Sequence, residues 1–422
     1  MQEAVKLLAD QKMMPLLRKI NDEYAYWDKV KYLAPDGTDG KVLWQTVKLQ
    51  RILNAKTVTF GRYVFRFTVT ERMLVLLHEF DMNMGGNLGT QNLIPEDDRN
   101  FYLVSSIMEE AIASSRMEGA STTRKVAKEM LRKQQRPKDK GQQMIVNNYS
   151  TIRYLAEHRQ DEFSVKKLLD IHRLISSKTL EKPEEEGNIR QDDNVVVIND
   201  ITGDIVHVPP QHDEVEQLLE ELCHFANNDD PDDFIHPIIK GIIIHFMLAF
   251  IHPFSDGNGR TARSLVYWYL IKKGYWLTEY LSISRIIYKN KNRYEKTFLY
   301  TENDNYDLSY FILFNLVTMK KAYEELKSYL QRKISERNSI TTFTQIEGIS
   351  LRQSYIVNII KDKPDSIITV KEIATRFSIT EKTARTDLRN LVKRGLMEER
   401  PLNNRTIGYI RSDGFYNIIE HK

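Results

Sequence analysis

Cysteine is nearly absent from this chain of 422 residues, which contains one, Cys223. A single cysteine excludes an internal disulfide and suits a reducing compartment. Cys223 lies in a predicted helix, Val215–Phe225, and no thiol motif surrounds it. We therefore interpret it as a buried structural thiol and expect a cytoplasmic protein.

The chain also lacks a charge excess of either sign and a long hydrophobic run. It has 61 Lys and Arg against 58 Asp and Glu, for a net charge of +3. This balance gives no general affinity for nucleic acid or anionic membranes, so any basic surface must be local. The most apolar run, Ile238–Ile251, contains Lys240 and His245 and is too short for a bilayer. The N-terminus lacks the apolar core of a signal peptide, so we expect a soluble protein without a membrane partner.

The length predicts two or three domains, and repeats and low-complexity tracts are missing. We predict a mainly α protein with a small α+β N-terminal region at residues 1–92. That region contains a strand or hairpin at Lys56–Thr70, a helix from Glu71 to Phe80 and a linker at Asn83–Asn92. A helical core at residues 93–336 and a third domain at residues 337–422 follow.

The core is predicted to be helical with one interruption. Asp193–Pro210 has two short apolar segments separated by turn-forming residues, which predicts a short β-hairpin, and Pro209 and Pro210 end it. The predicted helices of the core are Phe101–Arg116, Thr123–Gln135, Ile145–His158, Ser164–Ser176, Val215–Phe225, Pro237–Phe250, Gly259–Lys273 and Leu308–Glu336.

The loop between the helices Pro237–Phe250 and Gly259–Lys273 carries chemically useful residues. It reads His252-Pro253-Phe254-Ser255-Asp256-Gly257-Asn258-Gly259-Arg260-Thr261-Ala262-Arg263. Its two glycines let the backbone approach an oxyanion without a Cβ in the way. Exposed amide groups then open a helix, whose N-terminus favours anions. These features predict a phosphate site.

Four side chains of the loop fit the same chemistry. Arg260 and Arg263 are three residues apart on neighbouring parts of the helix and suit a polyphosphate. Asp256 suits a Mg²⁺ ion that bridges phosphates, and His252 is a base that works near neutral pH. A Gly-Asn-Gly turn or a His-Pro pair alone is more often structural. The complete string favours a catalytic interpretation.

The string resembles the defining motif of the Fic family, HPFx[DE]GNGRxxR, and every specified position is matched. The resemblance runs from about Leu93 to about Leu316. It includes Gly187-Asn188-Ile189-Arg190 before the hairpin, Val208-Pro209-Pro210 after it, and Tyr306-Asp307-Leu308 beyond the site. It implies a Fic-type helical core with a β-hairpin flap, which aligns a target segment as an added strand at the edge of the flap. It also implies transfer of AMP from ATP, with Mg²⁺, to a Ser, Thr or Tyr hydroxyl.

The resemblance assigns roles to individual residues by motif position. His252 would deprotonate the target hydroxyl, Asp256 would hold Mg²⁺, and Phe254 would anchor the loop in the core. The arginines would hold the outer phosphates, and a local similarity also places Tyr294 beside the base. The residues expected at the nucleotide are Phe254, Ser255, Asp256, Gly257, Asn258, Gly259, Arg260, Arg263 and Tyr294.

The predicted inhibitory helix, residues 101–119, carries the family's inhibitory pattern, [ST]xxxE[GN], at Ser114, Glu118 and Gly119. Ser114 and Glu118 are four residues apart and share one helical face. The resemblance implies that Glu118 pairs with Arg263 and displaces the γ-phosphate, which is the N-terminally inhibited class. In some relatives the same glutamate supports removal of AMP, so the direction of reaction stays open.

The C-terminal segment resembles a winged helix-turn-helix. Val370–Phe377 is predicted as its first helix, Glu381–Arg394 as its recognition helix with Thr380 as N-cap, and Leu396–Ile410 as its wing. The side chains expected to be exposed on the recognition helix are Lys382, Thr383, Arg385, Thr386 and Arg389. Winged modules bind DNA or protein, and both partners stay open.

The leading hypothesis is a protein adenylyltransferase restrained by Glu118, acting on a protein hydroxyl, including one of its own. A de-AMPylase using the same site is the first alternative. The second is a DNA-binding regulator with a nucleotide-sensing core, which the intact His252 disfavours. A homodimer is compatible with the sequence.

Overall fold

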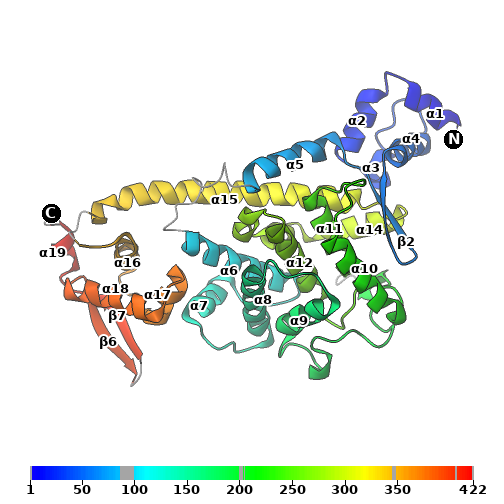
Figure 1. Cartoon of the computed structure of the whole chain (residues 1–422). Coiled ribbons are helices and arrows are strands. Elements are labelled where there is room, and N and C mark those ends of the chain that lie inside the picture. Colours follow the sequence, from blue (N-terminus) through cyan, green and yellow to red (C-terminus); the bar gives the residue numbers. More distant parts are fainter. Residues whose placement is uncertain are drawn as a thin grey trace. The chain divides into compact units, whose positions relative to one another are not determined.

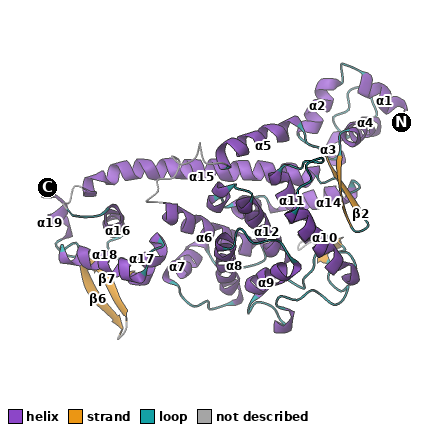
Figure 2. Ribbon diagram, viewed as in Figure 1, coloured by secondary structure: helices purple, strands orange, loops and turns teal. Residues whose placement is uncertain are grey.

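A computed structural model describes residues 2–85, 99–198, 203, 205–344, 348–403 and 406–420, with side chains described up to residue 332 of the long helix α15. The chain is mainly helical, which confirms the predicted fold class (Figures 1 and 2). It divides into two compact units. The first comprises Met1–Gly86, Ser150–Thr278 and Ile283–Ala322, and the second comprises Asn87–Tyr149, Glu279–Ser282 and Tyr323–Lys422.

The first unit begins with five helices and a hairpin. Strands β1 and β2 pair antiparallel from Lys56 with Phe67 to Phe60 with Tyr63, as a hairpin predicted from the alternating pattern. Helix α5 begins after Thr70, whose side chain accepts the Met73 amide, a typical N-cap. The predicted linker Asn83–Asn92 lies largely outside the described residues. The elements are α1 Gln2–Ala9, α2 Met14–Asp22, α3 Trp27–Val30, α4 Gly40–Leu53, β1 Lys56–Phe60, β2 Tyr63–Phe67 and α5 Glu71–Met84.

The remainder of the first unit is the helical core with one small hairpin. Its elements are α9 Val165–Ser176, β3 Val197–Ile198, β4 Ile205–His207, α10 Val215–Asn227, α11 Pro237–Ile251, α12 Asn258–Lys272, α13 Ile283–Lys289, α14 Lys291–Asn303 and the first part of α15 Ser309–Thr344. Helix α15 therefore extends beyond the predicted end at Glu336.

Helices α11 and α12 pack against each other at the centre of the first unit. Helix α11 is apolar except for Lys240 and His245 and is almost entirely buried, as expected of a helix surrounded by others. Its Gly241 permits close packing, because a Cβ there would lie 3.1 Å from the Tyr269 ring of α12. On α12, Trp268 stacks on Phe163 at 3.9 Å. This pair of helices fixes the loop that joins them.

The second unit contains the predicted winged helix-turn-helix. Strand β7 lies between β5 and β6 in an antiparallel sheet, and β6 and β7 form the wing. Thr380 caps the recognition helix, as predicted. The elements are α6 Arg99–Met117, α7 Arg124–Lys133, most of α8 Lys140–Glu157, the end of α15, α16 Leu351–Asp362, β5 Ile368–Thr369, α17 Val370–Phe377, α18 Glu381–Lys393, β6 Met397–Asn403, β7 Thr406–Arg411 and α19 Phe415–Glu420.

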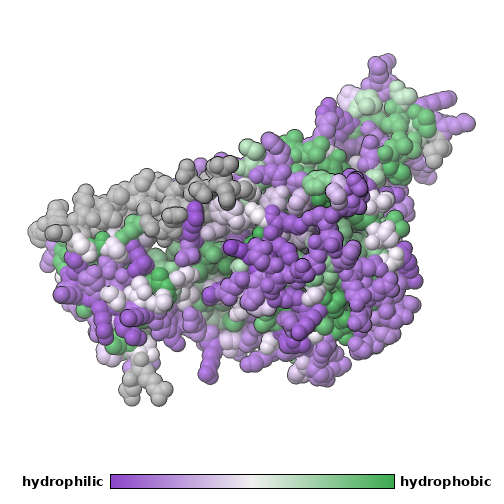
Figure 3. All heavy atoms as spheres, in the orientation of Figure 1, coloured by the Kyte–Doolittle hydropathy of each residue, from purple (hydrophilic) through white to green (hydrophobic). Residues whose placement is uncertain are grey.

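The visible surface is largely hydrophilic (Figure 3), and the lone cysteine is buried. Hydrophilic side chains cover much of the visible face, and apolar ones gather over the N-terminal helices (Figure 3). Cys223 is buried, and burial raises the pKa of its thiol to about 12, so it is a structural thiol as predicted. Among the described residues, no helix combines the length and the apolarity that a membrane span requires.

Candidate functional site

Helix α11 ends at Ile251, and the candidate base His252 is its C-cap. His252 has φ 50° and ψ 56°, and its amide closes the helix by donating to the Leu248 carbonyl. Because Pro253 follows, the α conformation is disfavoured at this position and the chain turns away. The Nδ1 atom of His252 lies 3.2 Å from the Ala249 carbonyl oxygen. A carbonyl only accepts, so Nδ1 carries the proton of the neutral ring and Nε2 is its basic nitrogen.

The loop after His252 is held by reciprocal hydrogen bonds. The Phe254 amide donates to the Asn258 side-chain oxygen at 3.0 Å, and the Asn258 side-chain nitrogen donates to the Phe254 carbonyl at 2.7 Å. Both residues are buried, and Phe254 is 0% exposed. The structure therefore places Phe254 in the core, and Asn258 closes the loop on itself.

His172 on α9 supports this loop, a role that the sequence did not reveal. Its ring stacks on Phe254 with centroids 3.7 Å apart and planes 2° apart. Its Nε2 donates to the Asp256 carbonyl at 2.9 Å, and its Nδ1 accepts the Gly187 amide at 3.0 Å. Burial lowers the pKa of His172 to about 4, so the ring is neutral, as these contacts require. No local sequence pattern marks His172, because its partner Asp256 is 84 residues away.

The N-terminus of α12 is the place where the glycines predict an anion site, and that site stays a prediction. Gly257 has φ +89°, a conformation that disfavours other residues. A Cβ at Gly257 would also lie 3.3 Å from the His172 ring, tighter than an ordinary contact. The amides of the first helical turn, beginning at Asn258, have no acceptor inside the helix. The amides of this turn can therefore donate hydrogen bonds to phosphate oxygens.

The charged side chains of the motif differ in exposure. The Asp256 side chain is 46% exposed, and its Oδ1 accepts the Gly257 amide at 2.5 Å. Arg260 is fully buried and donates to the Ile175 carbonyl at 3.1 Å, with its guanidinium 3.7 Å from Asp256. In this conformation the Arg260 side chain links the loop to the end of α9 on its buried side. The predicted contact of Arg260 with phosphate stays a prediction.

Arg263 lies one helical turn further along α12, nearly buried, on a small cavity of about 20 Å³. His245 of α11 lines the same cavity, and burial, with Arg263 nearby, lowers the pKa of His245 to about 3. The Tyr294 hydroxyl forms a 2.9 Å hydrogen bond with His245 Nε2. The predicted position of Tyr294 beside His252 is not tested by this contact and stays a prediction.

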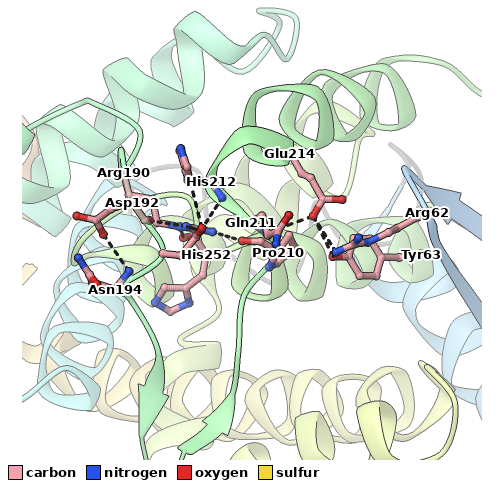
Figure 4. Close-up of polar contacts among 11 residues, drawn as sticks. Arg62, Tyr63, Arg190, Asp192, Asn194, Pro210, Gln211, His212, Glu214 and His252 are labelled. Atoms are coloured by element: carbon pink, nitrogen blue, oxygen red, sulfur yellow. Dashed lines mark hydrogen bonds and ion pairs between the residues drawn. The ribbon is translucent and has the colours of Figure 1, made fainter.

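Arg190 connects the base to both ends of the flap (Figure 4). Its Nε donates to the His252 carbonyl at 3.1 Å, and its backbone amide donates to the Pro253 carbonyl at 2.9 Å. Its other guanidinium nitrogens donate to the Asp192 carbonyl, to the Asp193 carboxylate and to the Pro210 carbonyl. One buried side chain therefore ties the entry and the exit of the hairpin to the His-Pro turn.

The flap itself is a short antiparallel pair. Val197 pairs with His207 and Ile198 with Ile205, while most of the predicted turn Asn199–Asp204 lies outside the described residues. Val208 is 69% exposed, and Ile198 and Ile205 are exposed as well. Exposed apolar residues on a strand pair suit the addition of another strand.

Two polar contacts anchor the flap to the core. His207 Nε2 donates to the Phe250 carbonyl at 2.8 Å, near the end of α11, and His207 Nδ1 lies 2.9 Å from the Glu302 carboxylate of α14. At the flap exit, the Glu214 carboxylate accepts from Arg62 and Tyr63 of the β1–β2 hairpin (Figure 4). The N-terminal hairpin therefore contacts the segment that leaves the flap.

The predicted inhibitory residues lie at the end of α6 in the second unit. Ser114 is buried within the helix, whereas Glu118 and Gly119 are exposed. Gly119 has φ +90°, which ends the helix in the usual way. Because Arg263 belongs to the first unit, the expected ion pair between Glu118 and Arg263 stays a prediction.

The residues present fit a phosphate-bound metal. Among the described residues, no group of three or more His, Cys, Asp and Glu could hold a metal by itself. Mg²⁺ commonly uses one or two carboxylates together with substrate phosphates. The partly exposed carboxylate of Asp256, beside the helix N-terminus, would be one such ligand.

Comparisons with known proteins match two regions of the chain, one of which contains the motif loop. Residues 162–270 match the Fic/DOC family, and residues 352–400 match the DeoR-like helix-turn-helix domain. Protein adenylyltransferase Fic of Nematostella vectensis is 31% identical over 117 residues, 28% of this chain and 25% of that protein. Protein adenylyltransferase fic-1 of Caenorhabditis elegans is 32% identical over 121 residues, 29% of this chain and 22% of that protein. The chain thus spans about a quarter of the length of these relatives.

A solved structure of a Fic family protein from Desulfovibrio desulfuricans is similar, with 18% identity and a TM-score of 0.49 over 81% of this chain and 94% of that one. The family match covers α9 to α12, the part of the chain that holds His172, Arg190, the flap and the complete loop from His252 to Arg263. This chain therefore carries a Fic/DOC family domain, followed by a DeoR-like helix-turn-helix domain.

Proposed function

We propose that this chain is a protein adenylyltransferase that transfers AMP from ATP to a Ser, Thr or Tyr hydroxyl of a protein. The observation that carries the proposal is the imidazole of His252, oriented by the Ala249 carbonyl at the start of the loop that opens α12. A base and a phosphate site thus share one short segment. The Fic/DOC match and the names of the relatives support the same reaction, and the buried lone cysteine supports a reducing compartment such as the cytoplasm.

In the proposed reaction, His252 Nε2 takes the proton of the target hydroxyl as its oxygen attacks the α-phosphorus. The bond from the α-phosphorus to the bridging oxygen breaks, and pyrophosphate leaves. Negative charge on the phosphate oxygens is offset by the first amides of α12 and by Arg263. The flap edge at Ile198, Ile205 and Val208 aligns the target segment next to the base.

The loop geometry supports the remaining motif roles. Asp256 would hold a Mg²⁺ ion, which would supply further positive charge to the phosphates. Gly257, Asn258 and Gly259 would contact the phosphates through the loop backbone, with Ser255 beside them on its exposed side. Phe254 and Arg260 would keep the loop in shape from the buried side.

Glu118 is the proposed brake. It is exposed just beyond the end of α6. Pairing with Arg263 would compete with the γ-phosphate and keep the transfer slow. Ser114, buried on the same helix, would fix the helix position. The alternative reaction is removal of AMP from a modified protein at the same site.

The decisive experiment is incubation of the purified protein with ATP labelled on the α-phosphate, together with Mg²⁺ and a mixture of proteins. Labelling should be weak in wild type, strong in Glu118→Gly and absent in His252→Ala. The double variant Glu118→Gly/His252→Ala removes the proposed inhibition, so any remaining loss of labelling is due to the loss of His252. If label transfer persists in that double variant, His252 is not the base. If a pre-labelled protein instead loses AMP only when Glu118 is intact, the reaction runs toward removal.

A second candidate function is duplex DNA binding by the C-terminal domain. The DeoR-like match supports it, and so does the exposed side of α18, where Lys382, Arg385 and Arg389 lie away from the buried face of Ala384 and Leu388. Gel shifts with Arg385→Ala/Arg389→Ala at several salt concentrations test it, because removing a cation that neutralises one phosphate reduces the salt slope by about one. Unchanged retardation would leave protein as the partner.

A further inference from the structure

A second pocket of the first unit lies apart from the motif loop. It has a volume of about 300 Å³ and is formed by the segment after α2, by α14 and by α15. None of the motif residues 252–263 lines it. Its volume falls at the lower end of the range for small-molecule sites.

The inner wall of this pocket is aromatic. Tyr26 and Tyr300 stack with centroids 4.3 Å apart and planes 19° apart. Tyr310 meets both rings edge-on, 5.7 Å from each. The Tyr300 hydroxyl donates to the Asp28 carboxylate at 2.8 Å, which fixes the orientation of the ring. The pocket therefore offers an ordered aromatic surface against which a planar group can pack.

The rim of the pocket is cationic. Five basic side chains line it, and none of them forms an ion pair with another described residue: Lys29, Arg72, Arg293, Lys296 and Lys321. Two acidic residues, Glu23 and Asp28, also line it, so the lining has a net formal charge of +3, five positive against two negative.

The basic residues of the rim differ from their neighbours in sequence, which form ion pairs. Lys320 pairs with Glu79, and Glu71 pairs with Arg18, whereas neither Lys321 nor Arg72 pairs with a residue in the described ranges. Cations gathered with few counter-charges repel one another and raise the local potential for an anion. Guanidinium and ammonium groups around an aromatic wall match a phosphate attached to a planar ring.

We propose that this pocket binds a small phosphorylated ring compound of the nucleoside monophosphate class, separately from the catalytic site. Arg293 and Lys296 of α14 hold the phosphate, and the ring lies against Tyr26 and Tyr300. Because Glu302, which anchors the flap strand through His207, is on the same helix, the ligand also acts on an element that supports the flap.

The test uses the full chain with 5′-AMP, 5′-GMP, inorganic phosphate and a poly-glutamate peptide as probes. Calorimetry measures affinity, and hydrogen exchange locates the ligand. A nucleotide should protect residues 23–29 and 290–300. Arg293→Ser/Lys296→Ser should weaken its binding at least tenfold, whereas Lys41→Ser/Lys166→Ser, with the same loss of charge at exposed sites, should leave it unchanged.

Each other outcome overturns this proposal. Protection limited to residues 252–263, surviving Arg293→Ser/Lys296→Ser, would mean that the nucleotide binds only the catalytic loop. If inorganic phosphate binds as tightly as 5′-AMP, the aromatic surface of Tyr26 and Tyr300 does not contribute to binding. Binding of the peptide without any nucleotide would make the pocket a docking site for acidic protein segments.

A separate observation concerns the second unit, where the helix-turn-helix is built onto the predicted inhibitory helix. The Phe101 ring of α6 lies 5.9 Å from Phe377 of α17 and 6.4 Å from Tyr355 of α16. The Gln134 side chain, at the end of α7, donates to the Thr375 hydroxyl at 2.9 Å. The first helix of the DNA-binding motif therefore packs on the helix whose far end leads to Glu118.

We infer that duplex DNA bound at α18 changes the rate of AMP transfer through α6, an inference that rests on the proposed function. A ligand shifts an equilibrium only if it favours one arrangement of the domain over another. An α-helix is stiff, so a shift of α17 against Phe101 would be passed along α6 to Glu118.

The test compares AMP labelling by the full chain with and without a saturating random-sequence 40-base-pair duplex. We expect the duplex to change the wild-type rate at least threefold and to have no effect on Phe101→Ala or Glu118→Gly. Phe377→Leu, which keeps an apolar contact, should respond partly. Strong labelling by Glu118→Gly with no response of wild type to bound duplex would overturn the coupling while leaving the enzyme proposal intact. Absence of labelling in every variant would defeat the enzyme proposal itself.

Discussion

The guanidinium of Arg190 donates to the carbonyl oxygen of His252 across 3.1 Å, and the same side chain reaches both ends of the flap. A backbone carbonyl that is withdrawn from water needs a hydrogen-bond partner, and Arg190 supplies one to His252. Arg190 therefore fixes the peptide that carries the candidate base and the strands that would align its substrate.

Replacing Arg190 by lysine should lower AMP transfer without unfolding the protein. Lysine keeps the charge but cannot reproduce the planar set of donors. We expect a loss of about ten- to a hundredfold in kcat, equivalent to about 1–3 kcal/mol in the barrier. Labelling kinetics in the Glu118→Gly background measure it, with Arg153→Lys, an exposed arginine paired with Glu157, as the control. A change in KM for ATP with unchanged kcat would argue against a role in positioning the base.

His172 should make the stability of the domain sensitive to acid. Burial lowers its pKa from the ordinary 6.5 to about 4, so between these values the unfolded chain binds more protons than the folded one. Its stabilising contribution is complete above about pH 6.5 and is lost as pH falls toward about 4, by about 3 kcal/mol in total.

Chemical denaturation of wild type and His172→Gln at pH 5 and pH 7.5 measures this effect. The variant should be less stable at pH 7.5, because glutamine cannot replace the ring stack on Phe254, but its stability should fall less on acidification. His224→Gln, at an exposed position, is the control and should retain the wild-type pH dependence. Equal acid sensitivity of wild type and His172→Gln would mean that other groups, such as the buried His245, dominate.

Glu118→Gly should raise labelling roughly tenfold, which corresponds to a barrier lower by about 1.4 kcal/mol. Because Glu118 is exposed beyond the end of its helix, the variant should still fold, which circular dichroism checks. Glu157→Gly, at the exposed end of α8, is the matched control and should leave labelling unchanged. A gain in both variants would point to general loosening of the chain.

The sequence predicted the elements of this fold because local patterns determine them. The apolar run of α11, the capping threonines Thr70 and Thr380 and the alternating pattern of Lys56–Thr70 all lie within single segments. The contacts that support the site instead join residues far apart in the sequence. Arg190 and His252 are 62 residues apart, and His207 and Glu302 are 95 apart. Such pairs depend on how helices pack, which spacing along one helix does not specify.

The motif loop shows the same limit at single residues. Spacing predicted that Arg260 and Arg263 both serve phosphates, and the string contains no reason to separate them. In the folded chain Arg260 is enclosed and bound to the Ile175 carbonyl. Arg263 is buried as well, at 4% exposure. What spacing did not show is the contact of Arg260 with the Ile175 carbonyl of α9, which depends on how α9 packs beside α12.

Charging the exposed edge of the flap should separate transfer to proteins from reaction with water. Ile205 and Val208 are 60% and 69% exposed, so lysine at either position should not disturb folding but would oppose an added apolar strand. In the Glu118→Gly background, Ile205→Lys and Val208→Lys should lower labelling of proteins by about tenfold. Pyrophosphate release from ATP without an acceptor should stay within about twofold, because His252 and the loop are untouched. Leu53→Lys, equally exposed on α4, is the control. Parallel loss of both activities would mean that the flap supports the catalytic loop itself, through the hydrogen bond from His207 to the Phe250 carbonyl.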